Sequence, residues 1–123
     1  MVTVARKLQI PPAGTVVVLG SPARVDLEIP DDCIVVSDPA DAPLASAVVS
    51  FVVRADDLDE LAGPAITAAR ADRLAWIAYP KSRQLGTDLN RDVLVALVRV
   101  RGAQPVRAVS IDGVWSALRF RPL

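Results

Sequence analysis

LAWIAYP (residues 74–80), KSRQLGTD (81–88) and LNRDVLVALVRVR (89–101) follow one another, and this stretch decides the fold. The first piece is an apolar run closed by Pro80, which predicts a buried strand. In the last piece apolar residues recur at helical spacing, which predicts a helix from about residue 88 to 101. Val93 and Leu97 are expected on its buried face, and Thr87 or Asp88 is expected to cap its start. The stretch therefore predicts a strand, a polar loop and a helix in succession.

Five further apolar runs predict the other strands. The six expected strands cover Thr15–Leu19, Cys33–Ser37, Ala47–Val53, Leu74–Tyr79, Pro105–Ile111 and Val114–Phe120. Carboxylates crowd residues 56–60, where the positive end of a helix dipole favours them, so a second helix is expected at about 56–70. Gly63-Pro64 could kink or divide that helix. Residues 21–32 give conflicting signals, because Ser21-Pro22 is typical of a helix start while Val25, Leu27 and Ile29 alternate as in an extended segment.

The order of these elements predicts an α/β fold. We expect a single-domain sandwich with a mixed, mainly parallel sheet of five or six strands. Residues 1–14 are expected to form an extended or loosely held N-terminal arm, and residues 15–123 the single α/β domain. The strand–helix–strand unit between residues 47 and 79 implies a parallel pair with a right-handed crossover. Asp112-Gly113 is a hairpin turn signal, so the last two strands should form a C-terminal antiparallel hairpin.

Composition excludes several classes of function. Fourteen basic residues balance fourteen acidic ones, so no net positive field favours nucleic acid or an anionic membrane surface. The chain has no histidine, which removes Ser-His-Asp and Cys-His nucleophile systems and most zinc sites. Cys33 is the one cysteine, so no intramolecular disulfide can form, and we expect it to be buried among apolar residues. We predict a protein with no catalytic residues, metal or cofactor.

The expected location is the cytoplasm. The N-terminus MVTVARKLQIPPAG lacks the long apolar core and the small-residue cleavage site of a signal peptide. No apolar run approaches the roughly 20 residues that a membrane span needs. A lone unpaired cysteine also fits a reducing compartment.

The loop after the fourth predicted strand holds the candidate site. Ligands of open α/β sheets bind beyond the carboxyl ends of the strands. The residues at or near that edge are Tyr79, Lys81, Ser82, Arg83, Asp88, Asn90 and Arg91. Lys81 and Arg83, together with the N–H groups that open the following helix, suit a phosphate or carboxylate. The alternative is structural: Thr87 or Asp88 caps the helix, and Arg91 pairs at the surface.

Two other residues, Trp115 and Asp38, allow two interpretations each. Trp76 and Trp115 lie within predicted strands, so core packing is expected for both. Trp115 with Arg119 and Arg121 could instead form an exposed interface on the last hairpin. Asp38 follows the second strand and could contact a ribose, but an aspartate before a proline is more typical of a turn start.

Two resemblances follow from these motifs. WIAYPKS (76–82), TDLNRD (87–92) and IDGVWSALRFR (111–121) resemble a family of small bacterial proteins, common in actinobacteria, whose function is not established. That resemblance implies one compact domain and carries over no catalytic residue. The order of elements from residue 47 onward is similar to the C-terminal half of class I methyltransferases, which are Rossmann-like. The N-terminal half departs from that pattern, because GSPAR (20–24) lacks the further glycines that let a backbone approach a cofactor.

The sequence leaves two main functions open. The first is a small non-catalytic binding or regulatory module that acts through protein contacts, as a homodimer or with another protein. The alternative is a binder of a small anionic ligand, such as a nucleotide or an S-adenosylmethionine-like molecule, at the loop after the fourth strand. An enzyme is a third class, and it would have to use lysine, tyrosine, aspartate or cysteine chemistry alone.

Overall fold

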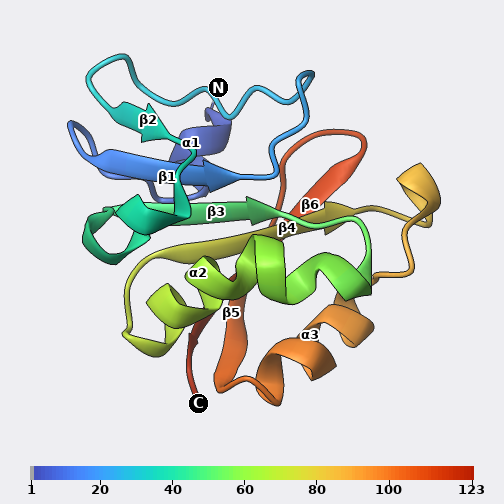
Figure 1. Cartoon of the computed structure of the whole chain (residues 1–123). Helices are drawn as coiled ribbons and strands as arrows, with labels where there is room; N and C mark the ends of the chain where they lie inside the picture. The colour runs from blue at the N-terminus through green and yellow to red at the C-terminus, as the bar shows by residue number, and fades with distance from the viewer. Residues whose placement is uncertain (1) are drawn as a thin grey trace.

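The computed structural model describes residues 2–123 and has six strands in one mixed sheet with helices packed on it (Figure 1). The strands are β1 Thr15–Leu19, β2 Ile34–Val36, β3 Ala47–Phe51, β4 Ala75–Pro80, β5 Ala103–Ser110 and β6 Trp115–Pro122. The α-helices are α1 Val4–Lys7, α2 Leu58–Arg70 and α3 Arg91–Arg99. Short 3₁₀ turns cover η1 Pro39–Leu44, η2 Ala55–Asp57 and η3 Gln84–Gly86. The predicted single-domain α/β fold is confirmed.

The strand order is β2-β1-β3-β4-β6-β5. Strands β1 to β4 run parallel to one another, so their carboxyl ends meet at one edge of the sheet. β6 is antiparallel to both β4 and β5, which confirms the C-terminal hairpin and makes the sheet mixed. β2 and β5 therefore lie at the two open sides of the sheet.

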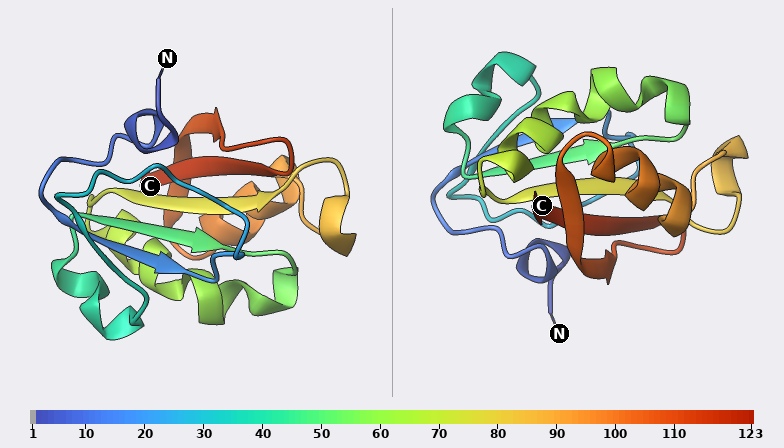
Figure 2. Two further views of the ribbon diagram at one scale, coloured as in Figure 1. Left: turned by 90° about the horizontal axis from the view of Figure 1, so that it is seen from above. Right: turned by 90° about the horizontal axis from the view of Figure 1, so that it is seen from below.

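The two faces of the sheet have different covers (Figure 2). Helices α2 and α3 and the η1 turn cover one face, where Val48, Leu58 and Leu94 belong to a shared apolar core. On the other face α1 packs beside the irregular segment 21–33, and Leu8, Leu27 and Trp76 belong to a second core. A segment without regular structure thus stands where a helix would usually cover a parallel sheet.

Residues 2–14 differ from the extended arm that the sequence suggested. Thr3 Oγ1 accepts a hydrogen bond from Arg6 N and so caps α1. Val4, Leu8 and Ile10 are buried against the sheet. Trp76 Nε1 donates to Leu8 O over 2.8 Å inside the core. The physical reason for the difference is that these spaced apolar residues bury more surface as a helical turn than an extended arm allows.

Several predicted boundaries also change. β3 ends at Phe51 rather than at residue 53, and α3 begins at Arg91 rather than near residue 88. α2 continues through Pro64 as one helix. Gly63 permits this, because it has no Cβ to meet the proline ring that follows. Segment 21–32 contains neither helix nor strand, so its helix-start signal is wrong.

The burial of several side chains bears on the sequence-based predictions. Both tryptophans are buried, and Trp115 packs edge to face on Phe51 with ring centroids 5.0 Å apart, so the exposed-interface reading of Trp115 is wrong. Val93 is 37% exposed, so its predicted burial is wrong, whereas Leu97 packs partly buried against the core beside Leu94 and Val98. Cys33 is only half-buried; its thiol donates to Pro11 O over 3.4 Å.

Candidate functional site

The loop after β4 has an unusual backbone. Lys81 N donates to Val114 O over 2.7 Å, so the loop starts against the β5–β6 turn. Ser82, Arg83 and Leu85 then take φ angles of 41°, 62° and 56°, a left-handed region that costs side-chain-bearing residues energy. The loop therefore needs other contacts to hold it in this shape.

Part of the predicted site surrounds one hollow of about 490 Å³. Its lining includes Ser82, Arg83, Asp88 and Asn90, so these four lie together. The remaining predicted members, Tyr79, Lys81 and Arg91, do not line this hollow. The seven residues thus do not form a single pocket.

Lys81 joins the loop to the C-terminal hairpin. Its Nζ donates to Ser110 Oγ and to the carbonyl of Asp112, both over 2.6 Å. Gln84 Nε2 also donates to this hairpin, to Gly113 O over 3.1 Å. The ammonium group of Lys81 already has these acceptors, so anion binding would have to compete with them.

Asp88 joins the same loop to the junction of β3 and α2. Its Oδ1 accepts from Ala55 N over 2.8 Å, and its Oδ2 lies 3.5 Å from Arg54 Nη2. Arg54 Nη1 donates to Gly86 O over 2.9 Å. The Thr87 hydroxyl donates to Val53 O and accepts from Leu89 N. These contacts give Asp88 and Thr87 structural roles that differ from the predicted capping of α3.

The cap of α3 is Asn90. Its Oδ1 accepts from Val93 N over 2.8 Å, and its backbone is extended as an N-cap requires. The predicted capping by Thr87 or Asp88 is wrong, because residues 88 and 89 stay outside the helix while Asp88 turns toward Ala55.

Tyr79 lies at the end of β4, 9% exposed. Burial raises the pKa of its phenol above the ordinary value of 10.0. The charge of Arg91 and a hydrogen bond with Ser116 lower that pKa in part, and Asp92 adds to the rise. The phenol is therefore neutral at physiological pH and acts as a packed side chain.

Asp38 has the role that its position before Pro39 indicated. Its Oδ1 accepts from Ala40 N over 2.9 Å and so caps the η1 turn. The turn-start interpretation is confirmed.

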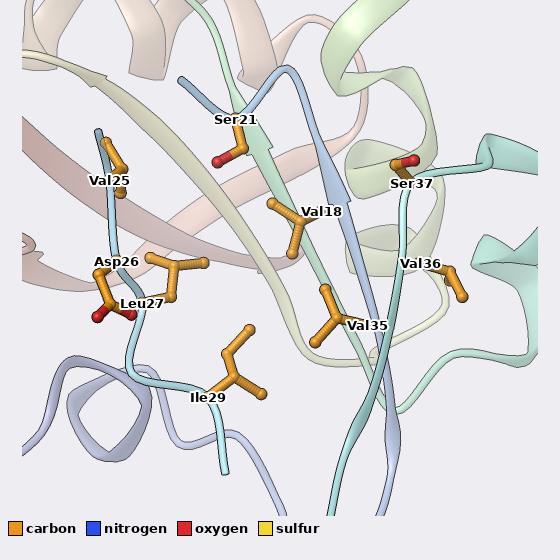
Figure 3. Close-up of a pocket in the computed structure, with 9 residues that line it drawn as sticks. All are labelled: Val18, Ser21, Val25, Asp26, Leu27, Ile29, Val35, Val36 and Ser37. Carbon is orange, nitrogen blue, oxygen red and sulfur yellow. The ribbon is translucent and has the colours of Figure 1, made fainter. Parts of the chain in front are cut away.

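A second hollow, which the sequence did not reveal, lies beside β2 on the α1 side of the sheet (Figure 3). Its volume is about 450 Å³. Aliphatic side chains from β1, β2 and the segment between them line it, with three polar residues among them: Val18, Ser21, Val25, Asp26, Leu27, Ile29, Val35, Val36 and Ser37. In Figure 3 Leu27 and Ile29 point toward Val18 and Val35 across the hollow. The alternation of Val25, Leu27 and Ile29 was the one signal that could have indicated this wall.

β2 itself presents apolar residues to solvent. Ile34 is 63% and Val35 53% exposed, although both lie in a strand. β2 pairs on one side only, with β1. Exposed β-branched side chains along the open side of an edge strand are a feature that sheet proteins normally avoid.

The chain matches no family model, no curated protein and no solved structure. The resemblances to a bacterial family and to class I methyltransferases therefore stay predictions.

None of the helices in residues 2–123 has the length and apolar character to cross a bilayer. Within the same residues no three histidine, cysteine, aspartate or glutamate side chains are grouped as metal ligands.

Proposed function

We propose that the protein is a non-catalytic binding or regulatory module that acts through protein contacts, and that its docking surface is the β2 edge. We define the β2 edge as β2 together with the 450 Å³ hollow beside it. The observation that carries this proposal is the unpaired side of β2 with Ile34 and Val35 exposed along it. An extended segment of a partner would add a strand there.

The backbone of β2 supports strand addition. Ile34 N donates to Gly14 O over 2.9 Å, so the polar backbone groups of Ile34 point toward β1. Successive residues of a strand direct these groups to alternate sides, so the N–H and C=O of Val35 point to the open side. A partner strand would bond to them and extend the sheet by one strand.

The opposite edge of the sheet, at β5, is less suited to the addition of a strand. β5 contains Pro105, which has no N–H, and a register shift between Pro105 and Arg107. Arg107 is exposed at the same place. A proline, a bulge and a charge are devices that prevent edge pairing, and the three residues of β2 itself include none of them.

The polar groups after β4 support a non-catalytic role. Lys81, Asp88 and Asn90 each hold a loop or a helix end through the contacts described above. A catalytic set needs groups that are free to meet a substrate. These three polar side chains are therefore already used for structure.

A peptide selection tests the proposal. A library of random peptides is enriched on the immobilised protein and then screened against Val35→Asp, which places a charge on the β2 edge. The control is Val100→Asp, at the end of α3, where Val100 is 80% exposed. We expect the enriched peptides to bind wild type and Val100→Asp but not Val35→Asp. Enrichment of peptides that bind all three equally, or no enrichment, contradicts the proposed surface.

The partner is a second copy of the chain or another protein, and light scattering distinguishes the two. A homodimer through the β2 edge predicts a molar mass that rises with concentration in wild type and stays monomeric in Val35→Asp.

A second candidate function is the binding of a small anionic ligand, such as a nucleotide or an S-adenosylmethionine-like molecule, at the loop after β4. The supporting observation is Arg83, which lines the 490 Å³ hollow beside Ser82. Within residues 2–123 neither Arg83 nor Arg91 makes a side-chain hydrogen bond or an ion pair. Asp88 counts against this candidate, because it brings negative charge to the same hollow.

Thermal unfolding with a panel of nucleotides tests this second candidate. A ligand at 100 times its dissociation constant stabilises the fold by about 2.7 kcal/mol, which raises the melting temperature measurably. We expect Arg83→Ala to abolish that rise. A panel without any effect, or a rise that Arg83→Ala retains, contradicts it.

A further inference from the structure

The chain is neutral as a whole, but its charges are separated along the sequence. Residues 25–53 contain six carboxylates and no lysine or arginine: Asp26, Glu28, Asp31, Asp32, Asp38 and Asp41. All fourteen basic residues lie outside this range. Net charge therefore hides a strongly acidic segment.

That acidic segment is the one that builds the β2 edge. Asp31 and Asp32 come just before β2, and Asp38 just after it. Asp26 lines the hollow. All four are exposed, and within the described residues none forms a salt bridge. Four carboxylates thus flank or line this edge, and charges placed so steer a partner of opposite sign.

We infer that the β2 edge binds an extended segment of another protein in which aliphatic and basic side chains alternate. This inference rests on the proposed function and adds the chemistry of the partner. In a strand, alternate side chains point to opposite sides, so one set enters the hollow between Leu27 and Val35 while the other stays in solvent near the carboxylates. Aliphatic groups suit the hollow, and lysine or arginine suits its acidic surroundings.

A second copy of the chain fits this edge poorly. Two β2 edges facing one another would bring two acidic segments together, because a twofold interface uses the same patch on both partners. The like charges of the two segments would oppose pairing. Pairing β2 of one copy with β5 of another would place Pro105 and the bulge of β5 in the interface.

Three synthetic peptides of equal length test the inference. Each alternates valine with a second residue, which is lysine, threonine or glutamate. Binding is measured by fluorescence anisotropy at low and at raised salt. We expect the lysine peptide to bind about tenfold or more tightly than the threonine peptide, the glutamate peptide not to bind, and salt to weaken the lysine peptide.

Two matched variants locate the binding. Asp31→Asn/Asp32→Asn removes two carboxylates beside β2, and Asp56→Asn/Asp57→Asn removes two exposed carboxylates from η2. Both variants change net charge equally. We expect the first pair to weaken the lysine peptide severalfold and the second pair to have a much smaller effect. Val35→Asp should abolish binding, while Val100→Asp should not.

The outcomes separate this inference from the proposed function. If all three peptides bind alike and Val35→Asp abolishes their binding, the edge is a docking surface and the preference for basic partners is wrong. The same conclusion follows if the only peptides whose binding depends on Val35 are library peptides that contain no basic residue. The inference is wrong if the lysine peptide binds Val35→Asp as well as it binds wild type. It is also wrong if the two carboxylate variants weaken its binding equally. A dimer that Val35→Asp dissociates also overturns it, because the occupant is then a second copy.

Discussion

Gly20 follows directly after β1 and has a φ angle of +69°, in the left-handed region. A Cβ at this position would lie 2.6 Å from the carbonyl oxygen of Phe51, at the end of β3. Strands β1 and β3 are neighbours in the sheet, and the chain crosses one face after β1 and the other after β3. Gly20 thus lets two strand ends approach at the point where the fold changes direction.

Replacing Gly20 by alanine should destabilise the protein. The left-handed conformation costs a residue with a Cβ about 1–2 kcal/mol, and the contact with backbone adds to that cost. We expect the free energy of unfolding in urea to fall by at least about 2 kcal/mol. The control is Gly113→Ala, where a Cβ meets nothing within 4 Å. An effect of Gly20→Ala no larger than that of Gly113→Ala contradicts the role assigned to Gly20.

Tyr79 gives a direct test of burial, because it is the one tyrosine of the chain. Burial at the end of β4 raises the pKa of its phenol above 10.0. The absorbance of phenolate should therefore appear at higher pH in the folded protein than in urea. In the unfolded chain the phenol loses its proton first, so this group makes the fold less stable as pH rises above 10.0. A titration midpoint that is the same in both states contradicts the burial of Tyr79.

At the level of elements, α3 depends on Asn90. The helix has nine residues and receives one side-chain cap, from Asn90 Oδ1 to Val93 N. Its buried side chains Leu94 and Val98 fix it to the sheet. The cap determines where the helix starts, and hence where the loop after β4 ends.

Asn90→Ala should cost about 1 kcal/mol of folding stability, because an N–H at the helix start loses its acceptor. Asn90→Asp keeps an acceptor in the same place and should cost much less. Urea unfolding of both variants measures the difference. Equal loss in the two variants, or no loss in either, would show that the cap does not stabilise α3.

The strands were predictable because their physical signal is local. β1 and β4 show continuous apolar runs bounded by turn residues, and both appear within a residue of their expected bounds. Asn90 was not recognised as a cap, because Thr87 and Asp88 suit a cap equally well by residue type. Only the distant contacts of those two side chains, with Val53 and Ala55, exclude them. Contacts between residues this far apart in the chain have no signature in local sequence.

The same limit explains the candidate site. Ser82, Arg83, Asp88 and Asn90 do lie together, because polar residues after a strand end gather at one edge of the sheet. The use of Lys81 by the hairpin depends on Ser110 and the carbonyl of Asp112, which only the folded chain brings near. The sequence gives conflicting signals for the secondary structure of segment 21–32, and the hollow beside β2 depends on that segment.

At the scale of the whole molecule, the sheet has two unlike edges. The β5 edge is interrupted by Pro105 and a register shift. The β2 edge is short, apolar and surrounded by carboxylates, with a hollow beside it. A neutral chain thus presents one protected edge and one open, acidic edge, and this asymmetry is the physical basis of the proposed binding function.

A backbone NMR titration of the full chain with the alternating lysine–valine peptide tests this account most directly. The account predicts that the amide signals of residues 33–37 and 25–29 shift together, and that the same titration of Val35→Asp leaves them unchanged. Shifts that gather instead at residues 82–90, or signals that do not respond anywhere, would contradict it.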